Sequence, residues 1–243
     1  MNDWLPHQSN FLFEILDMEA PPLDTTCTSC LVDESQIRCL DCLGSPTLCR
    51  RCCLNAHQYN PYHKIEVWNG KCYVPSDLHN IGLLLHLGHG GDRCPQNVGE
   101  THHIAKADLK TTTNAGPLHA GSDDDDGDRY WDNEDFEEDV ITIVHTTGVH
   151  KRHVRWCHCP SAASRPIQLL RMRLYPSSVK KPQTAFTFSV LDYFYVDSME
   201  CKTSANNFFN KLRRLTSNAF PHTVPVCHIE NCYLSLFMHF AMH

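Results

Sequence analysis

Residues 27–63 read CTSCLVDESQIRCLDCLGSPTLCRRCCLNAHQYNPYH and contain three C-x2-C pairs followed by two histidines. A C-x2-C turn brings two thiolates within reach of one ion, and Zn²⁺ prefers four thiolate or imidazole ligands in a tetrahedron. Eight such ligands are enough for two structural zinc sites. The eight candidate ligands are Cys27, Cys30, Cys39, Cys42, Cys49, Cys52, His57 and His63.

Three other interpretations of these cysteines are open: disulfides, packing residues and a catalytic site. The N-terminus, MNDWLPHQSNFLFEILDMEA, lacks a basic region, a long apolar run and a small-residue cleavage site, which argues against secretion and a disulfide framework. Simple packing of buried thiols does not require the repeated x2 spacing. A catalytic zinc needs an open coordination position, and eight ligands leave none. We therefore expect an intracellular chain with structural metal, in which Cys53 is a spare thiol or a core residue.

A second, looser set of ligands lies in LGHGGDRCP and VHKRHVRWCHCP. His89, Cys94, Cys157 and Cys159 would complete a third site with three cysteines and one histidine. A Cys-x-Cys pair reaches one metal only where the backbone turns tightly, and the two halves are more than sixty residues apart. Coincidence is therefore the alternative to a metal that joins two parts of the chain.

The chain is long enough for two small domains, and its pattern predicts an α+β fold. A small zinc-stabilised module with short hairpins and helices is expected first, followed by a β-hairpin and a helical unit. The expected boundaries are a flexible arm at 1–24, the zinc module at 25–96, an acidic disordered linker at 97–138, a basic hairpin and helical unit at 139–225, and a tail at 226–243.

Local signals mark the elements within these units. Asn69 and Gly70 lie between two strand-like runs and predict a tight hairpin, and Ser76 is a candidate N-cap for a short helix. The segment DVITIVHTTGVHKRHVRWCHC predicts a second hairpin. Residues 186–218 show a helical period, with Thr203 or Ser204 as the cap.

The formal net charge of −7 hides two segregated charges. Residues 123–139 hold eleven acids and one arginine, whereas residues 150–215 hold twelve lysines and arginines and three acids. The basic region is a candidate for phosphate contacts, the alternative being an ordinary solvated face. Its named candidates are Lys151, Arg152, Arg155, Arg171, Arg173, Lys180, Lys181, Arg213 and Arg214. No apolar run approaches the roughly 18 residues of a membrane helix, so no membrane partner is expected.

The first cluster resembles B-box and related cross-brace zinc modules, in which alternate ligand pairs share a metal. That resemblance implies one site from Cys27, Cys30, Cys49 and Cys52 and another from Cys39, Cys42, His57 and His63.

Four phrases resemble the cysteine-cluster domain found beside KDZ (Kyakuja-Dileera-Zisupton) transposases. They are CLDCLGSPTLCRRCCLNAHQYNPYHKIEVWNG, IGLLLHLGHGGDRCP, HTTGVHKRHVRWCHCP and the segment from RPIQLLRMRLYP to NAFPHTVP. The resemblance covers the chain from about Cys27 to Pro225, except for the linker. The resemblance implies a zinc-chelating accessory module of a transposable element, typical of fungal genomes and nuclear. It also strengthens the third site, because GH…CP and C-x-CP are hallmarks of that domain.

The chain departs from that family in two places. The acidic stretch at 105–135 resembles an insertion, and after Pro225 the sequence continues as VCHIENCYLSLFMHFAMH and stops, which suggests a truncated end. Cys227, His228 and Cys232 are therefore poor ligand candidates.

Two functions compete on these grounds. The first is a non-catalytic zinc module without a transposase domain, which binds DNA or a transposition partner. The second is a B-box-like protein-interaction scaffold unrelated to DNA. An enzyme or a small-molecule substrate is not expected, because Cys–His pairs at zinc spacing are better explained as ligands than as catalytic dyads.

Overall fold

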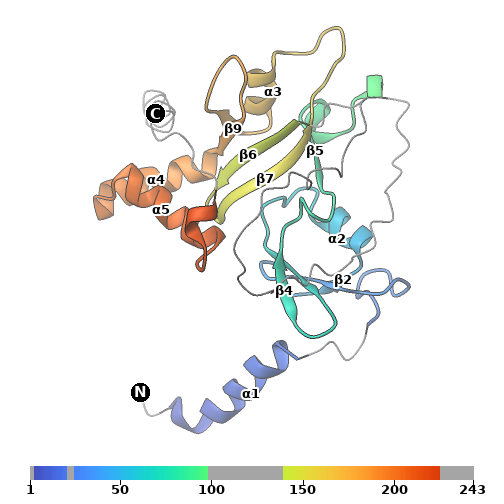
Figure 1. Ribbon diagram of the computed structural model, residues 1–243, viewed down its shortest axis with the longest axis vertical. Helices are drawn as coiled ribbons and strands as arrows, with labels where there is room; N and C mark the ends of the chain where they lie inside the picture. The colour runs from blue at the N-terminus through green and yellow to red at the C-terminus, as the bar shows by residue number, and fades with distance from the viewer. Residues whose placement is uncertain (1–2, 21–24, 98–138, 225–243) are drawn as a thin grey trace, which may run out of the picture.

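The computed structural model of the chain describes residues 3–20, 25–97 and 139–224 (Figure 1). The expected linker at 97–138, apart from Asn97, and the expected tail lie outside the described residues. The described elements up to residue 97 are η1 (Leu5–His7), α1 (Gln8–Met18), β1 (Ile37–Cys39), β2 (Thr47–Leu48), α2 (Arg50–Ala56), β3 (Ile65–Trp68), β4 (Tyr73–Ser76), β5 (Leu84–His86), η2 (His89–Gly91) and η3 (Pro95–Asn97). Those after residue 138 are β6 (Asp139–His145), β7 (Gly148–Arg155), α3 (Arg165–Arg171), β8 (Leu174–Pro176), β9 (Thr184–Thr187), α4 (Phe188–Cys201), α5 (Ala205–Thr216) and η4 (Pro221–Thr223).

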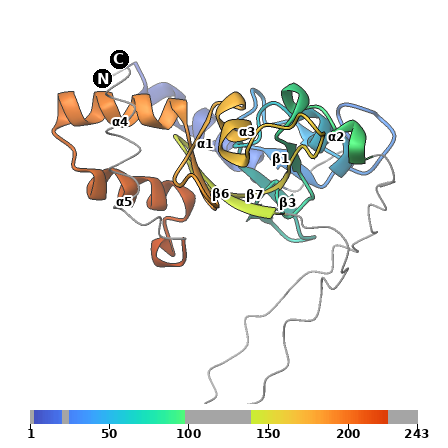
Figure 2. The same cartoon turned by 90° about the horizontal axis from the view of Figure 1, so that it is seen from above.

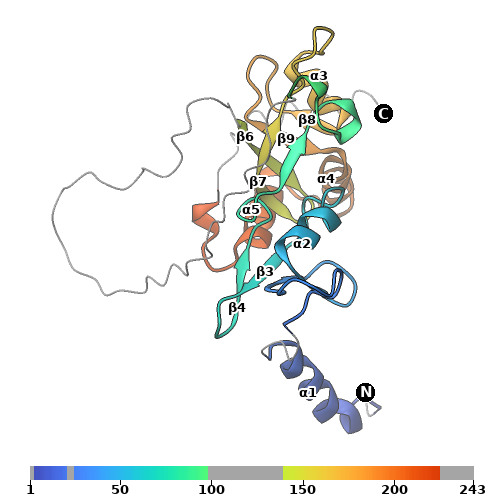
Figure 3. The same ribbon diagram turned by 90° about the vertical axis from the view of Figure 1, so that its right-hand side faces the viewer.

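Helices and sheets are both present, as the predicted α+β class requires, and they form two sheets. The first is antiparallel with the order β2-β1-β3-β4, and α2 lies beside it. The second is mixed with the order β5-β7-β6-β9-β8. The first sheet lies between α1 and the second sheet along the long axis of the molecule (Figures 1 and 3).

Both predicted hairpins are confirmed. β3 pairs with β4 from Ile65↔Ser76 to Trp68↔Tyr73, and the Asn69 side chain accepts hydrogen bonds from the backbone N–H groups of Lys71 and Cys72 at 2.9 Å. Such a side-chain turn, with Gly70 at φ +90°, is the chemistry that the Asn-Gly pair predicts. β6 pairs with β7 over the whole length of β6, from Asp139↔Val154 to His145↔Gly148.

The prediction of a short helix capped by Ser76 is wrong. Ser76 is the last residue of β4, and the following residues turn sharply into β5. The turn forms because the carboxylate of Asp77 accepts the backbone N–H of His79 at 2.8 Å. Leu78, Ile81 and Leu83 point into the core of the first module from this turn.

The pairing of β5 crosses the expected division between the two units. This strand belongs to the first predicted unit in sequence, but it pairs in parallel with β7 in the second sheet, from Leu84↔His153 to His86↔Arg155. Parallel pairing joins strands that are distant in sequence, so local hydrophobic patterns did not indicate it.

The helical prediction for residues 186–218 is confirmed for α4 and α5, with Ser204 as the cap of α5, whereas Phe186 and Thr187 belong to β9. The Ser204 hydroxyl accepts the backbone N–H of Asn207 at 3.3 Å. Phe208, Phe209 and Leu212 are buried against β6, β7 and β9, whereas Leu215 is 43% exposed because it lies at the edge of the apolar stripe. Both helices project from the end of the second sheet that is remote from α2 (Figure 2).

The N-terminal arm was predicted to be flexible, but it contains η1 and α1. No side chain of α1 is buried, and the helix is attached at its end, where Arg38 donates to the Met18 carbonyl oxygen at 2.5 Å and pairs with Glu19 at 2.8 Å. The apolar residues of α1 lack the polar alternation that makes an amphipathic period obvious in sequence. Among the described helices, none is both long and apolar enough to cross a bilayer.

Candidate metal centres

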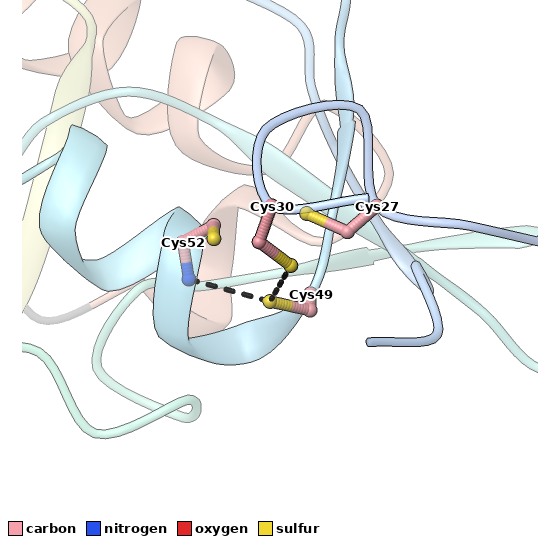
Figure 4. A group of neighbouring side chains, drawn as sticks. All are labelled: Cys27, Cys30, Cys49 and Cys52. Carbon is pink, nitrogen blue, oxygen red and sulfur yellow. Dashed lines mark hydrogen bonds between the residues drawn. The ribbon is translucent and has the colours of Figure 1, made fainter. Parts of the chain in front are cut away.

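The first centre is built by one loop and the start of α2. Cys27 and Cys30 lie in the turn that follows the isolated bridge Thr26↔Glu34, and Cys49 is the N-cap of α2 with Cys52 one turn later. The Cys49 sulfur accepts the backbone N–H of Cys52 at 3.5 Å. Figure 4 shows the four side chains facing one another.

The second centre uses the other end of the same helix. Cys39 ends β1, Cys42 follows in the next turn, His57 is the C-cap of α2, and His63 precedes β3. α2 contributes ligands to both centres. Along the chain, the first and third ligand pairs form the first centre, and the second and fourth pairs form the second centre. This is the alternation that the B-box resemblance implied.

The third centre lies where two neighbouring strands of the second sheet end. His89 and Cys94 follow β5, and Cys157 and Cys159 follow β7, the strand that pairs with β5 in parallel. Parallel pairing brings the carboxyl ends of the two strands to the same edge. This explains how residues more than sixty positions apart converge at one point.

In each of the three groups the ligand atoms lie within 4.8 Å of one another. For zinc, Zn–S distances of about 2.3 Å and Zn–N distances of about 2.0–2.1 Å give tetrahedral edges of about 3.8 Å between two sulfurs and about 3.6 Å between sulfur and nitrogen. The sulfur–sulfur distances are 4.0 Å for Cys30 and Cys49, 3.8 Å for Cys94 and Cys157, and 3.6 Å for Cys94 and Cys159. The donor sets and their spacing therefore fit a tetrahedral ion, and each cluster could hold zinc.

Imidazole–thiol distances agree with the same geometry. The His57 Nε2 atom is 3.2 Å from the Cys39 sulfur and 3.6 Å from the Cys42 sulfur, and His89 Nε2 is 3.3 Å from the Cys157 sulfur. A disulfide would require sulfurs about 2.05 Å apart, and every cysteine of the three groups is a free thiol.

Supporting contacts hold the ligands in place. The Nδ1–H of His57 donates to the carbonyl oxygen of Cys53 at 2.7 Å, which directs the Nε2 lone pair toward Cys39 and Cys42. In the third centre, Gln168 of α3 accepts the backbone N–H of Cys157 at 2.8 Å and donates to its carbonyl oxygen at 3.1 Å. Gln168 is buried and was missed in the sequence, where a glutamine within an apolar helix gives no signal of its partner.

Gly88 is a second residue that sequence reasoning did not single out. A Cβ atom at this position would lie 2.5 Å from the Cβ of Cys157, which is closer than real atoms approach. The backbone of Gly88 is extended at φ −113° and ψ 176°, so any residue could adopt its conformation. Space beside Cys157, and not backbone freedom, is what glycine supplies here.

The pKa values of His57 and Cys39 show that the second centre favours a positive charge beside a thiolate. The hydrogen bond that His57 donates to Cys39, followed by the one to Cys53, raises the pKa of His57 to about 11. Burial raises the pKa of Cys39, but the hydrogen bonds from His57, Cys42 and the backbone outweigh it and lower that pKa to about 6. A thiolate next to an imidazolium is the result, and a metal ion would displace the imidazole proton.

The first centre shows the complementary effect on its thiols. Burial raises the pKa of Cys27, yet hydrogen bonds from the backbone N–H groups of Cys30, Cys49 and Ser29 lower it to about 6. Burial, together with the neighbouring cysteines, raises the pKa of Cys49 to about 12. Once Cys27 is a thiolate, ionising its neighbours requires a cation that offsets the added negative charge. A divalent ion supplies that positive charge.

Two other predictions about side chains can be compared with the structure. Cys53 is fully buried in the core of the first module, where the sequence placed a spare thiol or a core residue. Arg152 is not part of a basic surface, because its side chain is 0% exposed and pairs with Asp77. Cys227, His228 and Cys232 lie outside the described residues.

Comparison with known proteins gives one match. The family model described as "CxC2 like cysteine cluster associated with KDZ transposases" matches residues 124–220. This range is narrower than the resemblance from about Cys27 to Pro225, and it begins within the acidic stretch that resembled an insertion. It includes Cys157 and Cys159, with the second sheet from β6 onward, α4 and α5. No curated protein and no solved structure matches the chain.

Proposed function

We propose that this chain is a non-catalytic, zinc-binding accessory module of a KDZ-type transposable element that binds duplex DNA. The observation that carries the proposal is the third centre, because it contains the C-x-C pair of the matched family and completes it with His89 and Cys94. Three complete tetrahedral donor sets support three zinc ions. Complete sets leave no open coordination position for a substrate or for water, which supports a structural role for the metals.

The metal proposal is tested by native mass spectrometry and by elemental analysis of the full chain. Three zinc ions per chain are expected. Cys39→Ser removes one thiolate of the second centre and should reduce the count by one, with loss of stability in the first module because binding energy is folding energy. Cys201→Ser is the matched control, since Cys201 is exposed and lies outside the three groups. Fewer than three metals in the wild type would contradict the assignment of three zinc centres.

DNA binding is supported by the charge of residues 150–215, which carry a net charge of +9. Of the nine basic candidates, Arg152 is excluded by its burial, while Lys151, Arg171, Arg173, Lys180, Lys181 and Arg214 are exposed. Binding through phosphates should weaken steeply with salt, because counterions are released when the complex forms. Fluorescence anisotropy with a labelled duplex at several salt concentrations tests this proposal. Absence of binding at low salt would contradict it.

A protein-interaction scaffold is the second candidate, and one observation favours it. Large apolar side chains of the N-terminal half are exposed, with Leu31 at 74%, Val32 at 78% and Tyr59 at 77% beside the first two centres. Exposed apolar groups that gather in one region often mark a binding surface. The scaffold function requires no DNA affinity, so the same anisotropy measurement separates the two candidates. A nuclear location is expected for the DNA-binding function.

A further inference from the structure

The outward face of α5 carries asparagine, arginine and lysine side chains, and the exposed Leu215 and Thr216 lie at its C-terminal end. Ala205, Phe208, Phe209 and Leu212 define the buried face. The polar positions before the last turn residue Thr216 are Asn206, Asn207, Asn210, Lys211, Arg213 and Arg214, and no aspartate or glutamate occurs between residues 205 and 216. This one face therefore combines positive charge with a row of amide groups that both donate and accept hydrogen bonds.

The helix is rigidly presented by its neighbour. α4 and α5 are joined by residues 202–204, with Lys202 in the left-handed conformation at φ +54° and Ser204 as the cap. Lys211 of α5 pairs with Asp197 of α4 at 2.9 Å, and its ammonium group lies 4.6 Å from the centre of the Tyr193 ring. α5 runs back alongside α4, so the two form a helical hairpin in which α4 supports α5 from one side (Figure 2).

An ordinary solvated face does not explain this composition. Solvated helix faces usually combine glutamate and lysine at i, i+4 spacing, because such pairs stabilise the helix. Asparagine is among the weaker helix formers, so Asn210 in the middle of α5 acts against local stability. The outward face also lines a shallow hollow formed by Asn207, Asn210, Lys211, Arg214, Leu215 and Asn218. A residue that lowers local helix stability is expected where its side chain has a role in binding.

We propose that α5 enters the major groove of duplex DNA and reads base edges with Asn207, Asn210 and Arg214. Asparagine can bond bidentately to adenine and arginine to guanine, and the major groove admits a helix. With a rise of about 1.5 Å per residue, the twelve residues of α5 span about 18 Å, so side chains on one face reach successive base pairs. Lys202, exposed in the turn before α5, contacts a phosphate. The inference rests on the proposed DNA-binding function and adds to it the reading element, the groove and the base chemistry.

The test begins with selection of preferred duplexes from a random pool by the full wild-type chain, followed by anisotropy on a selected and a scrambled duplex. The variant is Asn207→Ala with Asn210→Ala. Alanine is a better helix former than asparagine, so α5 and the fold are retained. The expected result is a loss of about tenfold or more in affinity for the selected duplex, with no change for the scrambled one and an unchanged salt slope.

The matched control is Lys202→Asn, which removes a charge and places a residue that tolerates the left-handed conformation. It should weaken binding to both duplexes equally and reduce the salt slope by about 1. Methylation of guanine N7, which lies in the major groove, should interfere with binding by the wild type. If the chain binds DNA but the double-alanine variant keeps its full preference, the inference fails while the proposed function stands. If the wild type binds no duplex at low salt, both fail.

Discussion

The side-chain Nε of Arg152 donates a hydrogen bond to the carbonyl oxygen of Pro61 at 2.8 Å, and this contact joins the second sheet to the first module. The same guanidinium pairs with Asp77 and donates to the carbonyl oxygen of its neighbour Lys151 at 2.6 Å. The Arg152 side chain is completely buried, so its charge depends on these partners. The interface between the two parts of the molecule is thus organised around one buried cation.

We expect Asp77→Asn to destabilise the chain by about 3 kcal/mol. Breaking a buried pair leaves an uncompensated charge at a cost of about 3–5 kcal/mol, and the lower end applies because the Asp77 side chain is 36% exposed. Chemical denaturation of the zinc-loaded chain measures the change. Asp197→Asn, which removes the partner of the more exposed Lys211, is the control and should cost about 1 kcal/mol or less. Equal effects of the two variants would contradict the assigned role of Arg152.

The stability should also fall as the pH decreases from about 6.5 to about 4, and His79 should account for part of the fall. Burial and the neighbouring charge of His153 lower the pKa of His79 to about 4, whereas an unfolded histidine titrates near 6.5. Between these values the unfolded chain binds more protons than the folded chain, so acid favours unfolding. Above about pH 6.5 the contribution of His79 is constant.

His79→Phe tests this contribution. The His79 ring stacks on His153 with 4.1 Å between ring centres, and its Nδ1 atom is buried without a hydrogen-bond partner among the described residues. Phenylalanine keeps an aromatic ring at the site and cannot be protonated. The variant should show a flatter pH dependence of unfolding than the wild type between pH 7 and 5. Parallel curves for the two proteins would show that His79 does not titrate as expected.

Gly88→Ala should empty the third centre without removing a ligand. The added methyl group would collide with the Cβ of Cys157, so Cys157 must move away from His89 and Cys94. Native mass spectrometry should show one zinc fewer than in the wild type, as it should for Cys157→Ser. Hydrogen exchange should increase in β5 and β7, while the first two centres keep their metals. A full complement of zinc in Gly88→Ala would show that the site tolerates the displacement.

The sequence predicted contacts that depend on short spacings and missed those that depend on long ones. Repeated C-x2-C pairs identified the ligands of the first two groups, and the Asn69-Gly70 and Thr146-Thr147 turns identified both hairpins. The parallel pair β5–β7 has no local signal, which is why the third group remained one of two alternatives. Nor does local pattern distinguish Arg152, buried opposite Asp77, from the exposed Lys151 beside it.

The last prediction concerns the acidic residues that precede β6. Residues 123–139 carry a net charge of −10, and Asp139 at their end begins β6 and pairs with Arg165 at 2.8 Å. Negative charge joined to the basic unit should compete with phosphates at low ionic strength, where charges interact over about 10 Å or more. Changing Asp123, Asp124, Asp125 and Asp126 to asparagine keeps the chain length and removes four charges. This variant should bind duplex DNA more tightly than the wild type at low salt, with the difference vanishing as salt increases.

Glu14→Gln with Asp17→Asn, which neutralises acids on the distant α1, is the control and should change little. Adding Arg213→Glu and Arg214→Glu to the neutralised variant should abolish the gain, because these arginines lie on α5, the proposed DNA-contacting helix. A gain that survives this addition would show that phosphate binds elsewhere on the basic unit.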